Sequence, residues 1–276
     1  MDFMFSNCQK LNLIYFPDLY LFNTTNISYM FNGCISLTSI MISNYIESSI
    51  LNHSYMLNNC ISLRYVNFKN FRTSNKINNQ MKYMFNNCHN ITSIDFSYLN
   101  IGFTKDYHKI FRNCENIQYL TLSHLKADYI SNLSYLFSNM TNLISIDLSK
   151  FNGPKIEHSL DGLFYNCNHL KYIDLSSYDF TNTTNIKNIF RGCSSLISLD
   201  LSNFSNSKIP DFSYLFTDCI NLTQLSMSNF KGSSVTNRMD YMFSNCKSLK
   251  NIIFNNLALR QTTNVSGMFD GCISLK

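Results

Sequence analysis

The chain has 276 residues, of which 45% are hydrophobic and only 14% are charged, and its formal net charge is +5. This apolar fraction is typical of a folded protein and excludes gross disorder. Because the lysines and arginines are scattered and never form a run, we expect no nucleic-acid partner. No segment approaches the roughly 20 apolar residues of a membrane span, and residues 1–5 do not resemble the start of a signal peptide.

The cysteines recur with a period of about 26 residues, and a fixed period in this range is typical of stacked repeat proteins. The one double gap contains Met140, which takes the vacant place. The cysteines are Cys8, Cys34, Cys60, Cys88, Cys114, Cys167, Cys193, Cys219, Cys246 and Cys272. The period predicts that residues 1–276 form a single solenoid of ten to eleven units, with partial terminal units and no evident caps. We expect it to be monomeric.

The first predicted element of each unit ends at the cysteine position. Apolar residues stand seven, four and three places before that position, as in Leu133, Leu136 and Phe137 before Met140. These spacings describe one face of a helix, and polar stretches upstream, such as residues 183–185, suit a helix start. We therefore predict a short helix or helical turn. The exceptions at the minus-seven place are His53 and Tyr107.

The second predicted element follows the cysteine position. Apolar residues stand three, six, eight and eleven places after it, and polar residues alternate with them, as in Ser198-Leu199-Asp200-Leu201-Ser202. Alternation with period two predicts a short strand with one buried face, parallel to the strand of the next unit. The connection to the next unit contains Pro154, Pro210 and the two extra residues of the unit from Cys60 to Cys88.

The whole unit resembles a known repeat. The strand half, Leu-x-x-Leu-x-Leu-x-x-Phe, is similar to a leucine-rich repeat. With Met-Phe-x-x-Cys before it, the unit resembles the 26-residue repeat of bacterial-type surface proteins, a relative of BspA-like (treponemal-type) leucine-rich repeats. The best matches are residues 30–37, 143–151, 170–178, 189–204 and 242–249. The resemblance implies an α/β, leucine-rich-repeat-like solenoid in a surface or secreted protein that adheres to a host or partner macromolecule.

The cysteines allow three sharper interpretations, none of which we favour. Disulfides between neighbouring units are compatible with a spacing of about 4.8 Å, but stacked side chains point in parallel, and Met140 leaves five cysteines on each side. A zinc site needs close pairs such as Cys-x-x-Cys, and a catalytic thiol needs one special cysteine. We expect buried free thiols that fill a corner of the core, and no metal or other cofactor.

Function is expected on the outward strand residues, five, seven and nine places after each cysteine position. The candidate binding face consists of Asp95, Asp147, Asp174, Asp200, Tyr65, Tyr119 and Tyr172. The aspartate row could bind calcium or a glycan through its carboxylates. We favour a solvated row that hydrogen-bonds to adjacent Ser and Thr. Tyrosines five places before the cysteine, such as Tyr29, Tyr55 and Tyr83, add a second outward aromatic row.

We find no catalytic motif and expect no enzyme; glycan hydrolysis at the aspartate row is the least favoured hypothesis. The favoured hypothesis is a non-enzymatic module that binds a protein or glycan at the cell surface or in secretions. The alternative is an intracellular, cytoplasmic scaffold for protein–protein interaction, which reduced cysteines and the missing signal peptide support.

Overall fold

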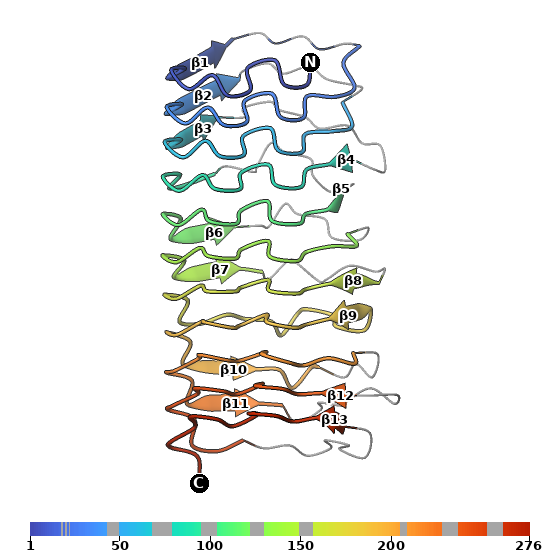
Figure 1. The fold of residues 1–276 in the computed structure, drawn as a ribbon, viewed down its shortest axis with the longest axis vertical. Helices are drawn as coiled ribbons and strands as arrows, with labels where there is room; N and C mark the ends of the chain where they lie inside the picture. The colour runs from blue at the N-terminus through green and yellow to red at the C-terminus, as the bar shows by residue number, and fades with distance from the viewer. Residues whose placement is uncertain are drawn as a thin grey trace.

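The computed structural model describes residues 1–17, 19, 21, 23–42, 50–67, 79–94, 104–121, 130–148, 157–204, 209–227, 237–252 and 262–276. Over these ranges the chain is a parallel β-solenoid whose successive coils lie on one another (Figure 1). The two termini lie towards opposite ends of the stack. None of the described residues belongs to a helix that could cross a membrane.

One column of short strands runs along the stack, at the left in Figure 1. Its described members are β1 (Leu13–Phe16), β2 (Ser39–Ile42), β3 (Tyr65–Asn67), β6 (Tyr119–Thr121), β7 (Ser145–Asp147), β10 (Ser198–Asp200) and β11 (Gln224–Ser226). They pair in parallel, and Ile40 lies opposite both Ile14 and Val66, 26 residues away in each direction. In β7, Ile146 is buried between two exposed neighbours. The predicted strand, its direction and its one-sided burial are therefore confirmed.

A second column of shorter strands lies at the opposite edge of the coils (Figure 1). It contains β4 (Asn79–Gln80), β5 (Thr104–Asp106), β8 (His158–Ser159), β9 (Thr183–Asn185), β12 (Asn237–Arg238) and β13 (Thr262–Asn264). Single parallel bridges extend it, for example from Asn52 to Asn26 and to Gln80. The sequence analysis did not predict this column, and β9 occupies residues 183–185, where we expected a helix to start.

The segment that ends at each cysteine position is a series of tight turns, so the predicted helix is wrong throughout the described ranges. The residues five places and one place before the cysteine have positive φ in coil after coil, as Tyr29 (56°) and Gly33 (72°) do before Cys34. A left-handed residue at every fourth position cannot continue a right-handed helix. Four-residue turns nevertheless keep apolar side chains at spacings of 3, 4 and 7, which is why the pattern imitated a helix.

These turns also explain how the coils are held together. The N–H of Cys34 donates to the carbonyl of Phe31 (3.2 Å) and closes a turn whose third residue, Gly33, has positive φ, as in a type II turn. The N–H groups of Phe31 and Gly33 instead donate to Met56 and Asn58 of the next coil, both at 2.9 Å. Backbone bonds thus alternate between closing a turn and joining two coils.

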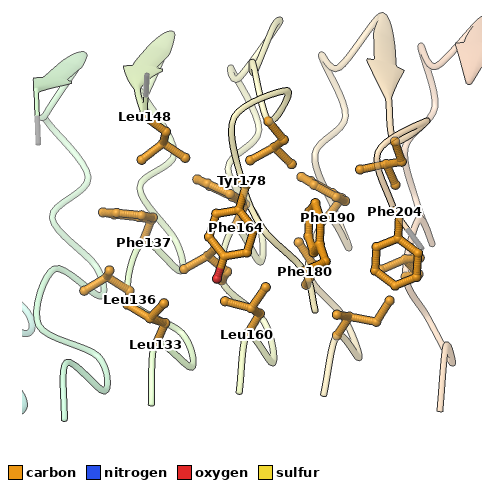
Figure 2. Close-up of a pocket in the computed structure, with 16 residues that line it drawn as sticks. Leu133, Leu136, Phe137, Leu148, Leu160, Phe164, Tyr178, Phe180, Phe190 and Phe204 are labelled. Atoms are coloured by element: carbon orange, nitrogen blue, oxygen red, sulfur yellow. The ribbon is translucent and has the colours of Figure 1, made fainter. Parts of the chain in front are cut away.

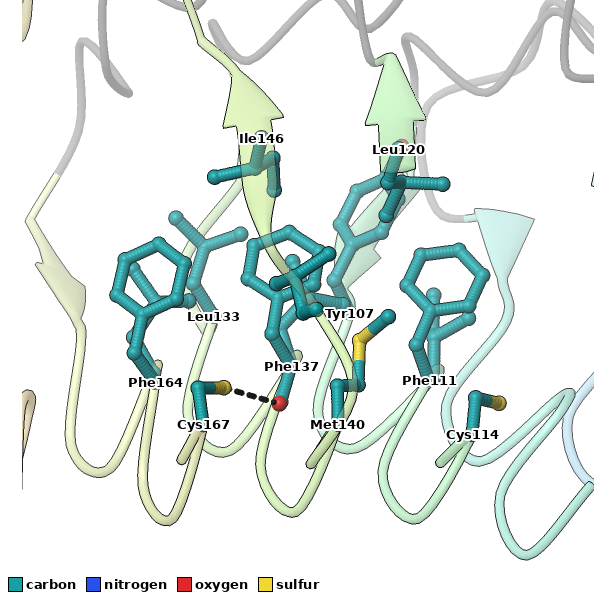
Figure 3. Close-up of a cluster of buried hydrophobic side chains, with 14 of the residues drawn as sticks. Tyr107, Phe111, Cys114, Leu120, Leu133, Phe137, Met140, Ile146, Phe164 and Cys167 are labelled. Atoms are coloured by element: carbon teal, nitrogen blue, oxygen red, sulfur yellow. Dashed lines mark hydrogen bonds between the residues drawn. The ribbon is translucent and has the colours of Figure 1, made fainter. Parts of the chain in front are cut away.

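A stack of phenylalanine rings forms the centre of the core (Figure 3). Phe137 is 1% exposed, and its ring is stacked between those of Phe111 and Phe164, at centroid distances of 6.1 and 5.3 Å. Most of the apolar residues predicted to be core are buried in the described interior coils, as are His53 and Tyr107, whereas Ile94, Ile173 and Ile252 are only partly buried. Each such phenylalanine contributes roughly 1.5–3 kcal/mol of burial free energy.

The cysteines line one edge of this core as free thiols, most of them buried. Nine of them donate to the carbonyl of the residue twenty-nine to thirty-one places earlier; Cys167 Sγ donates to Phe137 O at 3.1 Å (Figure 3). Burial raises the pKa of Cys193 to about 12, so this thiol is a poor nucleophile at neutral pH. The predicted buried position is confirmed for eight cysteines and for Met140, but it is wrong for Cys8, which is exposed, and Cys272 is only partly buried because each lies in a terminal coil. The hydrogen bond to the preceding coil was not predicted.

The core contains a small gap of about 30 Å³ whose lining includes Phe137, Phe164, Phe180 and Phe190 (Figure 2). An apolar gap of this size stays dry and is far below the volume of a ligand site. The interior at this gap therefore has a packing role.

Candidate functional site

On the outer surface of the first strand column, three exposed tyrosines stand five places after the cysteine position, and Tyr15 of β1, seven places after Cys8, is exposed there too. Tyr65 opens β3 and Tyr119 opens β6, while Tyr172 stands at the same place in a coil that has no strand there. These residues are 49%, 64% and 59% exposed, respectively. They point outward because side chains alternate along an extended chain and the next position faces the core.

Asp147 and Asp200 close β7 and β10, Asp174 stands at the same place of its coil, and all three are exposed. Asp174 Oδ1 accepts the N–H of Ser176 (2.9 Å), and Asp200 Oδ1 accepts the N–H of Ser202 (2.8 Å). Hydrogen bonds from the Ser176 side chain and backbone lower the pKa of Asp174, and those from Ser202, backbone first, lower the pKa of Asp200. Both carboxylates are ionised at neutral pH, and each keeps lone pairs for further donors.

A hollow of about 710 Å³ lies on this face and joins three of the predicted residues. Its lining includes Tyr172, Asp174, Ser198, Asp200, Gln224 and Ser226. This volume lies in the range of ligand pockets, and polar side chains from successive coils surround it. Tyr65, Tyr119 and Asp147 lie outside the hollow.

Asp147, Asp174 and Asp200 stand at the same place of three successive coils, and hydroxyl residues occupy that place in the coils on either side. Asp147 lies opposite Thr121, and Asp200 lies opposite Ser226. Asp95 falls outside the described residues. Among the residues that are described, no three His, Cys, Asp or Glu side chains gather as metal ligands. Asp174 and Asp200 each accept a hydrogen bond from the serine two places on.

The second aromatic row, on the turn segment, differs from the strand face. Tyr29, Tyr55 and Tyr83 occupy consecutive coils, and their rings stack at 4.5 Å with interplanar angles of 7° and 10°. Burial, followed by the neighbouring Tyr83 and Tyr29, raises the pKa of Tyr55 to about 12. In the next coil Lys109 replaces the tyrosine, and its Nζ lies 5.4 Å from the Tyr83 ring centroid and 5.5 Å from that of Tyr135. These ring faces are used within the fold.

The chain also matches a described family along its whole length. The match is to "Mycoplasma protein of unknown function, DUF285", over residues 1–119, 79–190 and 158–276. The chain belongs to the DUF285 family. None of the curated proteins matches this DUF285 chain.

Solved structures similar to the DUF285 chain are leucine-rich repeat proteins. One, from Bacteroides ovatus, is 20% identical over 96% of this chain and 73% of its own, with a TM-score of 0.46. The T. pallidum leucine-rich repeat protein is 18% identical over 67% and 81%, with a TM-score of 0.44. A leucine-rich cell surface protein from Faecalibacterium prausnitzii is 14% identical over 97% and 86%, with a TM-score of 0.38.

Two residues of the hollow in the DUF285 chain were missed by sequence reasoning. Asn251 stands five places after Cys246, so the rule that selected Tyr172 could have found it. Thr223 stands four places after Cys219, where the sequence gives no signal. Thr223 lines the hollow only because of how neighbouring coils lie on one another.

Proposed function

We propose that this DUF285 chain is a non-enzymatic macromolecule-binding module of a surface or secreted protein, with a role in adhesion or host interaction. The observation that carries the proposal is the exposed tyrosine and carboxylate face beside the hollow at Tyr172. Exposed aromatic residues beside polar groups are typical of recognition surfaces, and solenoids bind through their extended faces. The partner is a protein or glycan, and the module acts as a monomer.

The surface location rests on the repeat itself. The unit Met-Phe-x-x-Cys with its strand half recurs along residues 1–276 as a BspA-like repeat, and we propose that all ten to eleven units form one solenoid. Labelling of intact producing cells with a membrane-impermeant biotin reagent tests this location. A chain that is labelled only after lysis contradicts it.

The binding face is tested with the labelled chain on intact host cells. A variant carrying Tyr119→Ser, Tyr172→Ser, Asp174→Asn and Asp200→Asn should lose most of its binding, because it removes two aromatic platforms and two ionised acceptors. Lys82→Ser, on the turn segment at a place where other units carry serine, is the matched control and should bind normally. Undiminished binding by the fourfold variant would show that the strand face is not the binding face.

The second candidate is an intracellular leucine-rich-repeat scaffold for protein–protein interaction. One observation favours it: nine of the ten thiols are hydrogen-bond donors, and the chain uses its cysteines as reduced groups. Reduced thiols are typical of proteins that stay in the cytoplasm. The same labelling experiment separates the two candidates.

A further inference from the structure

One outward row of the strand face alternates tyrosine with serine. Five places after successive cysteine positions stand Tyr65, Ser93, Tyr119, Ser145, Tyr172 and Ser198. Tyr119 pairs with Ser145 across β6–β7, and the N–H of Ile197 donates to Lys171, which places Ser198 beside Tyr172. Paired strands in a sheet lie about 4.8 Å apart, and two coils at that spacing would place successive tyrosines of the row about 9.6 Å apart.

Among the described residues, no aromatic ring stacks on Tyr65, Tyr119 or Tyr172, and all three side chains are exposed. On the turn segment, tyrosines in consecutive coils cover one another at 4.5 Å. On the strand face the intervening serines are too small to cover a ring, and Tyr119 and Tyr172 are 64% and 59% exposed. Tyrosine side chains thus pack against one another on the turn segment, whereas those on the strand face remain exposed to a partner.

The groups beside these rings are hydrogen-bonding and negatively charged. Ser198, Asp174 and Asp200 line the hollow next to Tyr172, and the two carboxylates are held ionised by their serine partners. They accept hydrogen bonds from neutral hydroxyl or amide donors and repel an anionic polymer. The partner that fits is neutral, rich in donors and repetitive.

We propose that the strand face binds a neutral, extended, β-linked glycan of hexose or N-acetylhexosamine units along the column of β3, β6, β7 and β10, an inference that rests on the proposed function. When the linkage is β-1,4, the sugar rings turn over from one unit to the next, so the same ring face recurs with each disaccharide. That repeat is close to two coils of the solenoid. Every second sugar stacks on one of the rings of Tyr65, Tyr119 and Tyr172. Between these rings, sugar hydroxyls donate hydrogen bonds to the carboxylates of Asp174 and Asp200 and exchange them with the hydroxyl of Ser145.

Titration calorimetry of the full chain with cello- and chito-oligosaccharides of two, four and six units tests the spacing. Affinity should rise with each added disaccharide. Tyr172→Ser should weaken hexasaccharide binding about tenfold, and Tyr172→Phe should retain it. Tyr15→Ser, at an equally exposed tyrosine outside the row, is the control and should bind normally. Serine is native to this row, so these variants should fold, which thermal unfolding verifies.

The sharpest variant adds a ring instead of removing one. Ser145→Tyr fills the gap between Tyr119 and Tyr172 and should stack with both, as the turn-segment tyrosines do, so glycan affinity should fall. A rise in affinity would indicate unspecific aromatic adhesion and overturn the inference, and so would equal binding of α-linked malto-oligosaccharides. If no glycan binds while cell binding persists and needs the strand face, the glycan inference fails and the proposed function stands. If the chain binds neither the glycans nor host cells, both the glycan inference and the proposed function fail.

Discussion

Truncation of a central ring, Phe137→Ala, tests the core on which the whole stack depends. Phe137 is 1% exposed, and it loses stacked contacts on both sides, with Phe111 and Phe164. Truncation of a buried phenylalanine costs about 3–5 kcal/mol, because the transfer free energy is lost and a cavity remains. The existing gap of about 30 Å³ beside this ring would grow, and each neighbouring coil would lose a packing partner.

The assay is urea and thermal unfolding followed by far-ultraviolet circular dichroism. For a chain of this size the loss corresponds to a Tm lower by about 5–9 °C. Phe137→Leu is the matched control, because Leu57 occupies the same place and is fully buried. It should cost far less than the alanine variant. An unchanged unfolding midpoint for Phe137→Ala would refute the placement of this ring in a continuous core.

Three further predictions concern the turn segment and the thiols. Burial, followed by the charge of Lys109, lowers the pKa of His108, so the imidazole binds a proton more readily in the unfolded chain. Stability should therefore be full above about pH 6.5 and fall as the pH is lowered. His108→Ser should flatten this dependence when the free energy of unfolding is measured against pH. Iodoacetamide at neutral pH should modify exposed Cys8 and leave buried Cys167 intact until the chain unfolds, as mass spectrometry of peptides can show; rapid labelling of Cys167 would contradict its burial. Gly162→Ala should lower the free energy of unfolding by at least about 1 kcal/mol, because φ is +58° and the new Cβ would clash with the Tyr135 ring. Adding Tyr135→Ser to this variant should recover part of the lost stability. If stability does not recover, the Tyr135 ring is not the obstacle.

The sequence predicted the solenoid and its strands well because both follow from a fixed period. Ile40 opposite Val66 is a direct consequence of 26-residue units. The helix was wrong because apolar spacing alone does not distinguish a helix from a series of turns. The Asn or Gly that stands before most cysteines, such as Asn59 and Gly33, was the available signal, since these residues favour positive φ. Tyrosine at the other left-handed place, as at Tyr29, had no such signal, because ring stacking between coils selects it.

The candidate site was predictable in part for the same reason. Alternation along the strand identified Tyr119, Tyr172 and Asp200 as outward residues, and the structure places them so. The hollow was not predictable, because it depends on how coils overlap at Gln224 and its neighbours. The thiol hydrogen bond of Cys167 was equally hidden, since its acceptor is a backbone carbonyl of another coil.

The alternating backbone bonds have a consequence for the gene. Every coil joins the next through the same positions, so recombination that removes one whole unit leaves two surfaces that match. Deletion of codons 193–218 would join Gly192 to Cys219 and keep a left-handed residue before the cysteine. Smaller insertions are confined to the connection, as in the unit between Cys60 and Cys88. We therefore expect the chain to tolerate the loss of one whole coil, so that its length can change in steps of one coil as well as through short insertions in the connections.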